Sequence, residues 1–79
     1  MKPVAEYDRE ADAVYVRLSD KPYAFGEDID HERRIDYAED GTPIGVEITC
    51  ASTGVNLSDL PRREEIGRAL REFDLPIFA

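Results

Sequence analysis

The hydrophobic period of this sequence changes once, from two residues to about 3.6, close to residue 60. From Ile44 to Cys50 every second side chain is apolar, which is typical of a β-strand with one buried face. The spacing of one face of an amphipathic helix is instead found for Ile66, Ala69, Leu70 and Phe73. Because 79 residues leave room for one domain only, we predict a sheet followed by a helix within residues 1–79.

Four strands are predicted in residues 1–52, separated by short polar segments. They cover Val4 to Tyr7, Ala13 to Leu18, Ile29 to Tyr37 and Ile44 to Cys50. His31 and Arg33 interrupt the third strand, which indicates a bend, an edge position or a twist that carries them into solvent. Asp40-Gly41 predicts a tight hairpin turn, because both residues tolerate positive φ angles.

The helix is expected within residues 57–74. Ser58 or Asp59 is suited to cap its start, and Pro61 is tolerated in the first helical turn. Pro76 prevents the helix from continuing. We therefore predict an α+β fold of two layers, in which a four-stranded antiparallel β-meander packs against one C-terminal α-helix.

The chain ends in an apolar tail, residues 75–79, whose burial within one chain is not obvious. A chain of this length buries only about 60–65% of the surface that its unfolded form exposes, so a monomer is expected to be marginally stable. Both observations favour a homodimer.

The net charge of −8 belongs entirely to residues 1–60, which hold six basic and fourteen acidic side chains. Residues 61–79 hold four of each, and the helical arginines are expected to pair with glutamates on a solvated face. Contacts to phosphate need a surplus of Lys and Arg. We therefore expect no binding to nucleic acid or to an anionic membrane.

Cys50 is the single cysteine, so neither an internal disulfide nor a cysteine-based zinc site is expected. It completes the inward alternation of the fourth strand, which predicts an inert thiol in the core. The N-terminal residues contain no apolar run of signal-peptide length, and we expect a cytoplasmic protein.

Two groups of polar residues invite a chemical interpretation. Asp8, Glu10 and Asp12 alternate, but a calcium loop needs about six to eight oxygen ligands. An Asx-type turn, in which Asp8 and Asp12 accept backbone N–H groups, is the favoured interpretation. His31 lies among acidic residues and could serve as a base; with no nucleophile at a recognisable spacing, a solvent-facing histidine is favoured.

Two motifs, Tyr7 to Leu18 and Ile35 to Ile48, resemble the small family catalogued as domain of unknown function 2283. The resemblance covers about residues 4–52. The residues that carry it are Tyr7, Asp8, Ala11, Asp12, Tyr15, Leu18, Asp36, Tyr37, Asp40, Gly41, Gly45, Glu47 and Ile48. It implies a compact fold with a β-meander and offers no established catalytic residues. Some members are encoded beside small predicted toxins, which implies an antitoxin-like role for part of the family.

The leading hypothesis is a non-enzymatic protein-interaction module, without cofactor or metal, whose acidic sheet face binds a basic protein partner as an antitoxin would. Gly41 and Gly45 are interpreted as turn and sheet-packing glycines, because no glycine-rich phosphate loop is present. The alternative is a small metal-dependent enzyme or hydrolase, with a site formed by Asp8, Glu10, Asp12 and His31.

Overall fold

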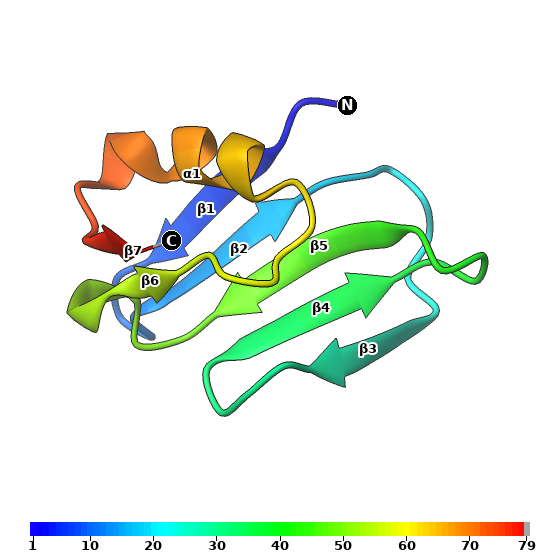
Figure 1. Ribbon diagram of the computed structural model, residues 1–79, viewed down its shortest axis with the longest axis horizontal. Coiled ribbons are helices and arrows are strands. Elements are labelled where there is room, and N and C mark those ends of the chain that lie inside the picture. Colours follow the sequence, from blue (N-terminus) through cyan, green and yellow to red (C-terminus); the bar gives the residue numbers. More distant parts are fainter. Residues whose placement is uncertain (79) are drawn as a thin grey trace.

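The computed structural model describes residues 1–78 and contains a five-stranded antiparallel sheet in the order β1-β2-β5-β4-β3 (Figure 1). The strands are β1 (Val4–Asp8), β2 (Ala13–Arg17), β3 (Phe25–Asp28), β4 (Arg33–Tyr37) and β5 (Pro43–Ile48). The predicted α+β class is confirmed, whereas the predicted number of four strands is wrong by one.

The additional strand is β3, which lies before the segment predicted as one strand, Ile29 to Tyr37; that segment begins with a turn. The Asp30 carboxylate accepts the N–H groups of Glu32 and Arg33 at 3.0 and 2.9 Å, and the Ile29 N–H donates to the Arg33 carbonyl. These bonds close a hairpin between β3 and β4. His31 therefore lies in the turn and is exposed, and its interruption of the apolar alternation marked a chain reversal.

The sheet is a meander only in part. β3, β4 and β5 follow one another as neighbours, but β2 pairs with β5 and not with the next strand in the sequence. β5 takes the central position because it has the longest apolar alternation, and Val46 is paired with Val16 on one side and Ile35 on the other. The connection from β2 to β3 consequently spans the width of two strands.

Residues 51–78, which we call the covering segment, cover one face of the sheet on the side of β1, β2 and β5, whereas Phe25 and Glu27 of β3 stay exposed (Figure 1). The covering segment consists of the 3-10 turns η1 (Ala51–Thr53) and η2 (Arg71–Phe73), the helix α1 (Arg63–Leu70), and the short strands β6 (Val55–Asn56) and β7 (Ile77–Phe78). β6 and β7 pair in parallel, with α1 as the crossover between them. In the described residues 1–78, no helix has the length and apolar character needed to cross a membrane.

The helix begins later than the predicted residues 57–74 and is shorter. Asp59 and Arg62 both have positive φ angles, 64° and 53°, so neither continues a right-handed helix. Arg62 occupies the N-cap position without a side-chain capping bond, which corrects the prediction of Ser58 or Asp59 as the cap. At the other end Asp74 adopts a left-handed conformation after η2.

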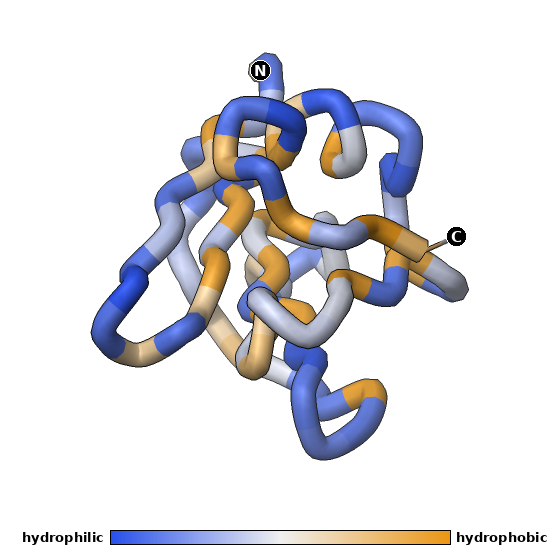
Figure 2. Tube along the Cα trace, turned by 90° about the vertical axis from the view of Figure 1, so that its left-hand side faces the viewer, coloured by the Kyte–Doolittle hydropathy of each residue, from blue (hydrophilic) through white to orange (hydrophobic). Residues whose placement is uncertain are grey.

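The core lies between the sheet and the covering segment, and the more hydrophobic parts of the trace converge there while the projecting turns are largely hydrophilic (Figure 2). Of the residues whose periodicity predicted burial, Ile44, Val46, Ile48, Ile66 and Leu70 are buried, whereas Ala69 and Phe73 are half-buried and Cys50 is exposed. The largest fully buried side chains are Leu18, Ile48, Ile66, Leu70, Val14, Val16, Val46 and Val55.

Most of the apolar tail packs against other residues of the same chain. Leu75 and Ile77 pack against the core, and the N–H groups of Val55 and Leu57 donate to the carbonyls of Pro76 and Phe78 at 2.8 and 2.7 Å. The tail therefore has a partner in β6, which the sequence did not reveal. Ala79, the last residue of the predicted tail, lies outside the described residues.

Arg33 is the buried charged residue of the described chain, with 7% of its surface exposed, which corrects its expected place in solvent. It faces the core beside Ile48 and donates to the carbonyl oxygens of Asn56 and Ser58. Its guanidinium also pairs with the Asp30 carboxylate at 3.0 Å. Arg33 thus fastens the connection between β6 and α1 to the sheet.

Candidate functional site

The face of the sheet opposite the covering segment is uncovered over all five strands of the described chain. Side chains alternate along β2 and β5, so that Val14, Val16 and Val46 are buried while Tyr15 and Glu47 point to the other side. We call this other side the open face. The strand register assigns to it Val4, Glu6, Asp8, Ala13, Tyr15, Arg17, Gly26, Asp28, Arg34, Asp36, Gly45 and Glu47.

One row of side chains crosses the whole open face from edge to edge. Each member is the cross-strand partner of the next, in the order Glu6, Tyr15, Glu47, Arg34 and Asp28. Directly paired side chains have Cβ atoms about 4.5–5.5 Å apart, so the row is continuous. A single tyrosine therefore lies between two carboxylates, Glu6 on β1 and Glu47 on β5.

The open face carries an excess of negative charge. It holds two guanidinium groups, those of Arg17 and Arg34. Its five carboxylates belong to Glu6, Asp8, Asp28, Asp36 and Glu47. Arg34 is already paired, at 3.0 Å with Asp28 and at 3.5 Å with Asp36. The carboxylates of Glu6 and Glu47 flank Tyr15 and are both exposed.

Tyr15 is held in place on the open face by two neighbours. Its hydroxyl donates to the Asp36 carboxylate at 3.1 Å, across the backbone of Gly45. A Cβ atom at position 45 would collide with the Tyr15 hydroxyl, so only glycine allows the ring to lie there. Burial and the bond to Asp36 raise the pKa of Tyr15 to about 12, which keeps the phenol protonated at neutral pH.

Gly26 on β3 leaves space for the Arg34 side chain, as Gly45 on β5 does for Tyr15. A Cβ atom at this position would meet the Arg34 guanidinium, which lies over β3 on its way to Asp28. Two glycines therefore let two long side chains lie against the sheet. Tyr15 and Arg34 therefore lie close to the backbone of the neighbouring strand.

The acidic turn between β1 and β2 is occupied by structural hydrogen bonds. Asp8 accepts the N–H groups of Glu10 and Ala11, both at 3.1 Å, which confirms the predicted Asx-type turn at that residue. Asp12 instead accepts bonds from the Tyr7 hydroxyl at 2.7 Å and from the N–H and hydroxyl groups of Ser52 at 2.9 and 2.6 Å. These bonds, the Ser52 hydroxyl first, lower the pKa of Asp12.

The carboxylates of this turn therefore point to different partners. Within residues 1–78 no group of three or more His, Cys, Asp or Glu side chains is placed to hold a metal ion. His31, the fourth residue of the predicted enzyme site, belongs to the separate turn between β3 and β4.

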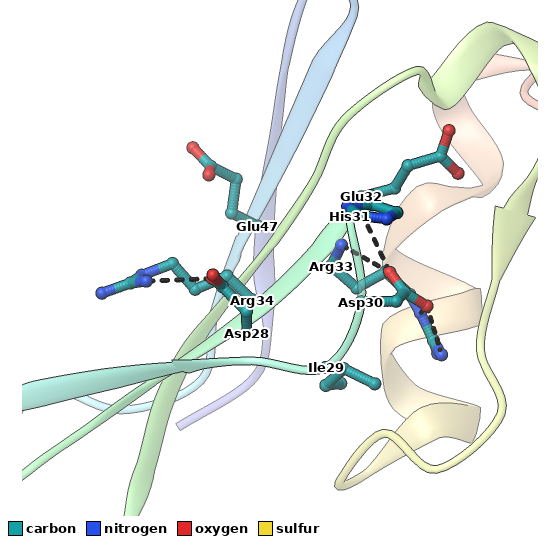
Figure 3. Close-up of a pocket in the computed structure, with 8 residues that line it drawn as sticks. All are labelled: Asp28, Ile29, Asp30, His31, Glu32, Arg33, Arg34 and Glu47. Atoms are coloured by element: carbon teal, nitrogen blue, oxygen red, sulfur yellow. Dashed lines mark hydrogen bonds and ion pairs between the residues drawn. The ribbon is translucent and has the colours of Figure 1, made fainter.

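The turn between β3 and β4 borders a shallow depression, which is drawn in Figure 3. Arg34 and Glu47 lie on one side of β4 in this view, and Arg33 and Asp30 lie on the other. The predicted solvent-facing position of His31 is confirmed. Hydrogen bonds from the backbone of Glu32 and from Arg33 lower the pKa of Asp30, which is therefore committed to holding the turn.

Cys50 is exposed, and the prediction of a core thiol is wrong. β5 ends at Ile48, and Cys50 adopts a left-handed conformation with φ of 53°, so the alternation does not extend to it. A hydrogen bond from the Cys50 thiol to the Glu32 carboxylate, and the negative charge of that carboxylate, raise the pKa of the thiol, which disfavours the nucleophilic thiolate.

The motif residues named from the sequence divide among three environments. Asp8, Tyr15, Asp36, Gly45 and Glu47 meet on the open face, and Leu18 and Ile48 are buried. The turns and half-buried positions hold Tyr7, Ala11, Asp12, Tyr37, Asp40 and Gly41. The open face also contains Glu6, Arg17, Asp28 and Arg34, which are not among the motif residues. The strand register places them there.

The fold and the open face define a small two-layer α+β protein with one sheet face covered by its own chain and the other presented as an acidic surface. The chain belongs to the family described as Protein of unknown function (DUF2283), whose profile matches residues 5–52. The resemblance expected from the motifs is thus confirmed. No curated protein and no solved structure matches the chain.

Proposed function

We propose that this protein is a non-enzymatic interaction module that binds a basic protein partner through the open face. One observation carries the proposal: five carboxylates share this uncovered face with two guanidinium groups, and one of those, Arg34, is paired internally. A surface of one sign steers a partner of the opposite sign and suppresses wrong partners.

The partner that the family resemblance favours is a small basic toxin, which makes the role antitoxin-like. This proposal places the protein in the cytoplasm and requires no cofactor. A homodimer remains part of the proposal, but it has to use another surface, because two open faces would bring like charges together. An adjacent small basic reading frame would support the toxin as partner.

Affinity capture with a charge-neutralised bait tests the proposal. The variant Glu6→Gln, Asp28→Asn, Glu47→Gln removes three exposed carboxylates of the open face. The matched control, Glu39→Gln, Glu64→Gln, Glu72→Gln, removes three exposed carboxylates elsewhere and changes the net charge equally. We expect a basic protein to bind wild type and the control but not the open-face variant.

Salt dependence gives a second readout of the same proposal. Exposed charges more than about 10 Å apart are largely screened at 0.1 M salt, so affinity should fall as salt is added. Binding that is insensitive to salt, or equal binding by both triple variants, would contradict an electrostatic role for the open face.

A further inference from the structure

We propose that Tyr15 is the anchor of the open face and receives an arginine side chain of the basic partner, between Glu6 and Glu47. This inference rests on the function proposed above and names the chemistry of the contact. The occupant is a foreign protein with an exposed arginine, because the excess of carboxylates on the face disfavours a second copy of the chain.

The first support is the arrangement of charges around the ring. Glu6 and Glu47 are the direct cross-strand partners of Tyr15 on its two sides. These two carboxylates, together with Asp8, Ala13 and Tyr15, border a shallow hollow of the open face. A cation entering the hollow would meet the carboxylates of Glu6 and Glu47 and the Tyr15 ring, which lies over Gly45. This combination is electrostatically complementary to a guanidinium group.

The second support is that Tyr15 is fixed before any partner arrives. The bond to Asp36 and the position of the ring against Gly45 restrict its side-chain rotation. An aromatic side chain that is already ordered loses little conformational entropy on binding. Tyrosines in such positions are enriched among the residues that dominate binding energy in protein interfaces.

The third support is that an arginine already stacks on another tyrosine of this chain. Arg9 lies over the ring of Tyr7, with its guanidinium carbon 5.6 Å from the ring centroid. In the part of the chain that the structure describes, no cation is stacked on Tyr15. Arginine is expected in preference to lysine, because a planar guanidinium can stack on the ring and bond carboxylates at its edge at the same time.

Titration with two simple probes tests the inference. An arginine oligomer and a lysine oligomer of equal length are titrated into wild type, Tyr15→Leu and Tyr15→Phe, and affinity is measured by calorimetry. We expect wild type to prefer the arginine oligomer and Tyr15→Leu to bind it about two- to fivefold more weakly, as loss of an exposed cation–π contact predicts. Tyr15→Phe keeps the ring and should retain the preference.

Phe78→Leu is the matched control, since Phe78 is an exposed aromatic residue of the covering segment, away from the row that contains Glu6 and Glu47. It should bind both oligomers like wild type. If Tyr15→Leu does not fold, chemical shifts of the Tyr15 ring protons in wild type give the readout, and they should move with the arginine oligomer.

Failure of this inference is distinguishable from failure of the proposed function. If the arginine preference persists in Tyr15→Leu, or the ring protons do not shift, the anchor is not Tyr15. If the open-face triple variant still loses binding to both oligomers in that case, the acidic face stands as the interaction surface. If the triple variant binds as tightly as wild type, both proposals are wrong.

Discussion

The hydrogen bond from the Tyr15 hydroxyl to Asp36 stabilises the fold only while the phenol is protonated. Its pKa is raised from 10.0 to about 12, so the folded state favours the neutral form. The stabilisation is therefore complete below pH 10 and is lost as the pH rises towards 12. Absorbance titration of the folded protein should show one tyrosine ionising last, and Tyr15→Phe should lack that step. A late step that persists in Tyr15→Phe would contradict the assignment.

Asp12 is expected to make stability depend on pH at the acidic end. Its pKa is lowered from 3.8 by bonds from Ser52 and Tyr7, so its contribution is present above pH 3.8 and declines as the pH falls through the lower folded value. Asn also tolerates the φ of 52° at this position, so Asp12→Asn removes the charge without adding strain. Denaturant unfolding should show Asp12→Asn less stable than wild type at neutral pH, with the difference shrinking in acid.

The control for this measurement is Asp20→Asn, which changes an exposed carboxylate in the loop after β2. Its stability should follow that of wild type over the same pH range. An equal loss in both variants would show that general charge, and not the bonds of Asp12, sets the dependence.

For single residues, the sequence predicted exposure or burial correctly within a regular apolar pattern and incorrectly where that pattern ends. The exposure of His31 and the packing role of Gly45 were predicted and are confirmed. Cys50 was misplaced because alternation stops being informative after the last paired residue, Ile48. The burial of Arg33 depends on the carbonyls of Asn56 and Ser58. These acceptors are distant in the sequence, so no local pattern predicts them.

Two neighbouring arginines on β4, Arg33 and Arg34, allow a test of how this strand is anchored to the covering segment. Arg33→Leu would leave two carbonyls of the β6–α1 connection and the Asp30 carboxylate without their partner, and should cost about 2–4 kcal/mol of unfolding free energy. Arg34→Leu removes exposed ion pairs on the opposite face, which contribute little. Chemical denaturation of the two variants should therefore give very different losses, and equal losses would contradict the anchoring role of Arg33.

Gly45 tests the close approach of β5 and the Tyr15 side chain. Gly45→Ala should displace the ring, break the bond to Asp36 and destabilise the fold by about 1–3 kcal/mol. In a Tyr15→Ala background the same substitution should cost much less, because the collision has been removed. A double-mutant cycle measures this coupling, and additive effects would show that Gly45 serves another purpose.

The elements were predictable to the extent that each has its own periodicity. The alternation in β2 and β5 located both strands, and the stripe from Ile66 to Leu70 located α1. The start of α1 was misjudged because Asp59 and Arg62 have positive φ angles, and Arg62 is held by bonds to the carbonyls of Leu18 and Met1, which are distant in the sequence. The turn at Asp30 was missed because its carboxylate substitutes for a Gly-containing turn signal.

At the scale of the whole molecule, strand order was the part that the sequence could not supply. Side-chain alternation determines which face of a strand is buried, but not which strand lies beside it. The pairing of β2 with β5 therefore emerged only in the structure, and with it the row that places Tyr15 between Glu6 and Glu47. The motifs named Asp8, Tyr15, Asp36, Gly45 and Glu47, but neither the other residues of the open face nor the assembly of the face was predicted.

Removal of residues 75–79 tests whether the tail stabilises a homodimer or the fold of a single chain. The sequence predicted that this deletion would weaken a homodimer, whereas in the structure β7 pairs with β6 of the same chain. We expect the truncated chain to unfold at lower denaturant concentration, because Val55 and Leu57 lose their acceptors and Ile77 leaves the core. Light scattering before and after truncation tests the homodimer, which stays a prediction; unchanged unfolding would contradict the intramolecular role.

The covering segment has a consequence for the modularity of the fold. The family match ends at residue 52, so it includes the five strands but not β6, α1 or β7, which seal their apolar side. A polypeptide limited to the matched region would expose Val14, Val16, Val46 and Ile48 to water. The five strands therefore cannot bury their apolar side without the covering segment, which follows them in the same chain. We expect that this segment can be supplied as a separate peptide, as in fragment complementation, while the acidic face stays intact.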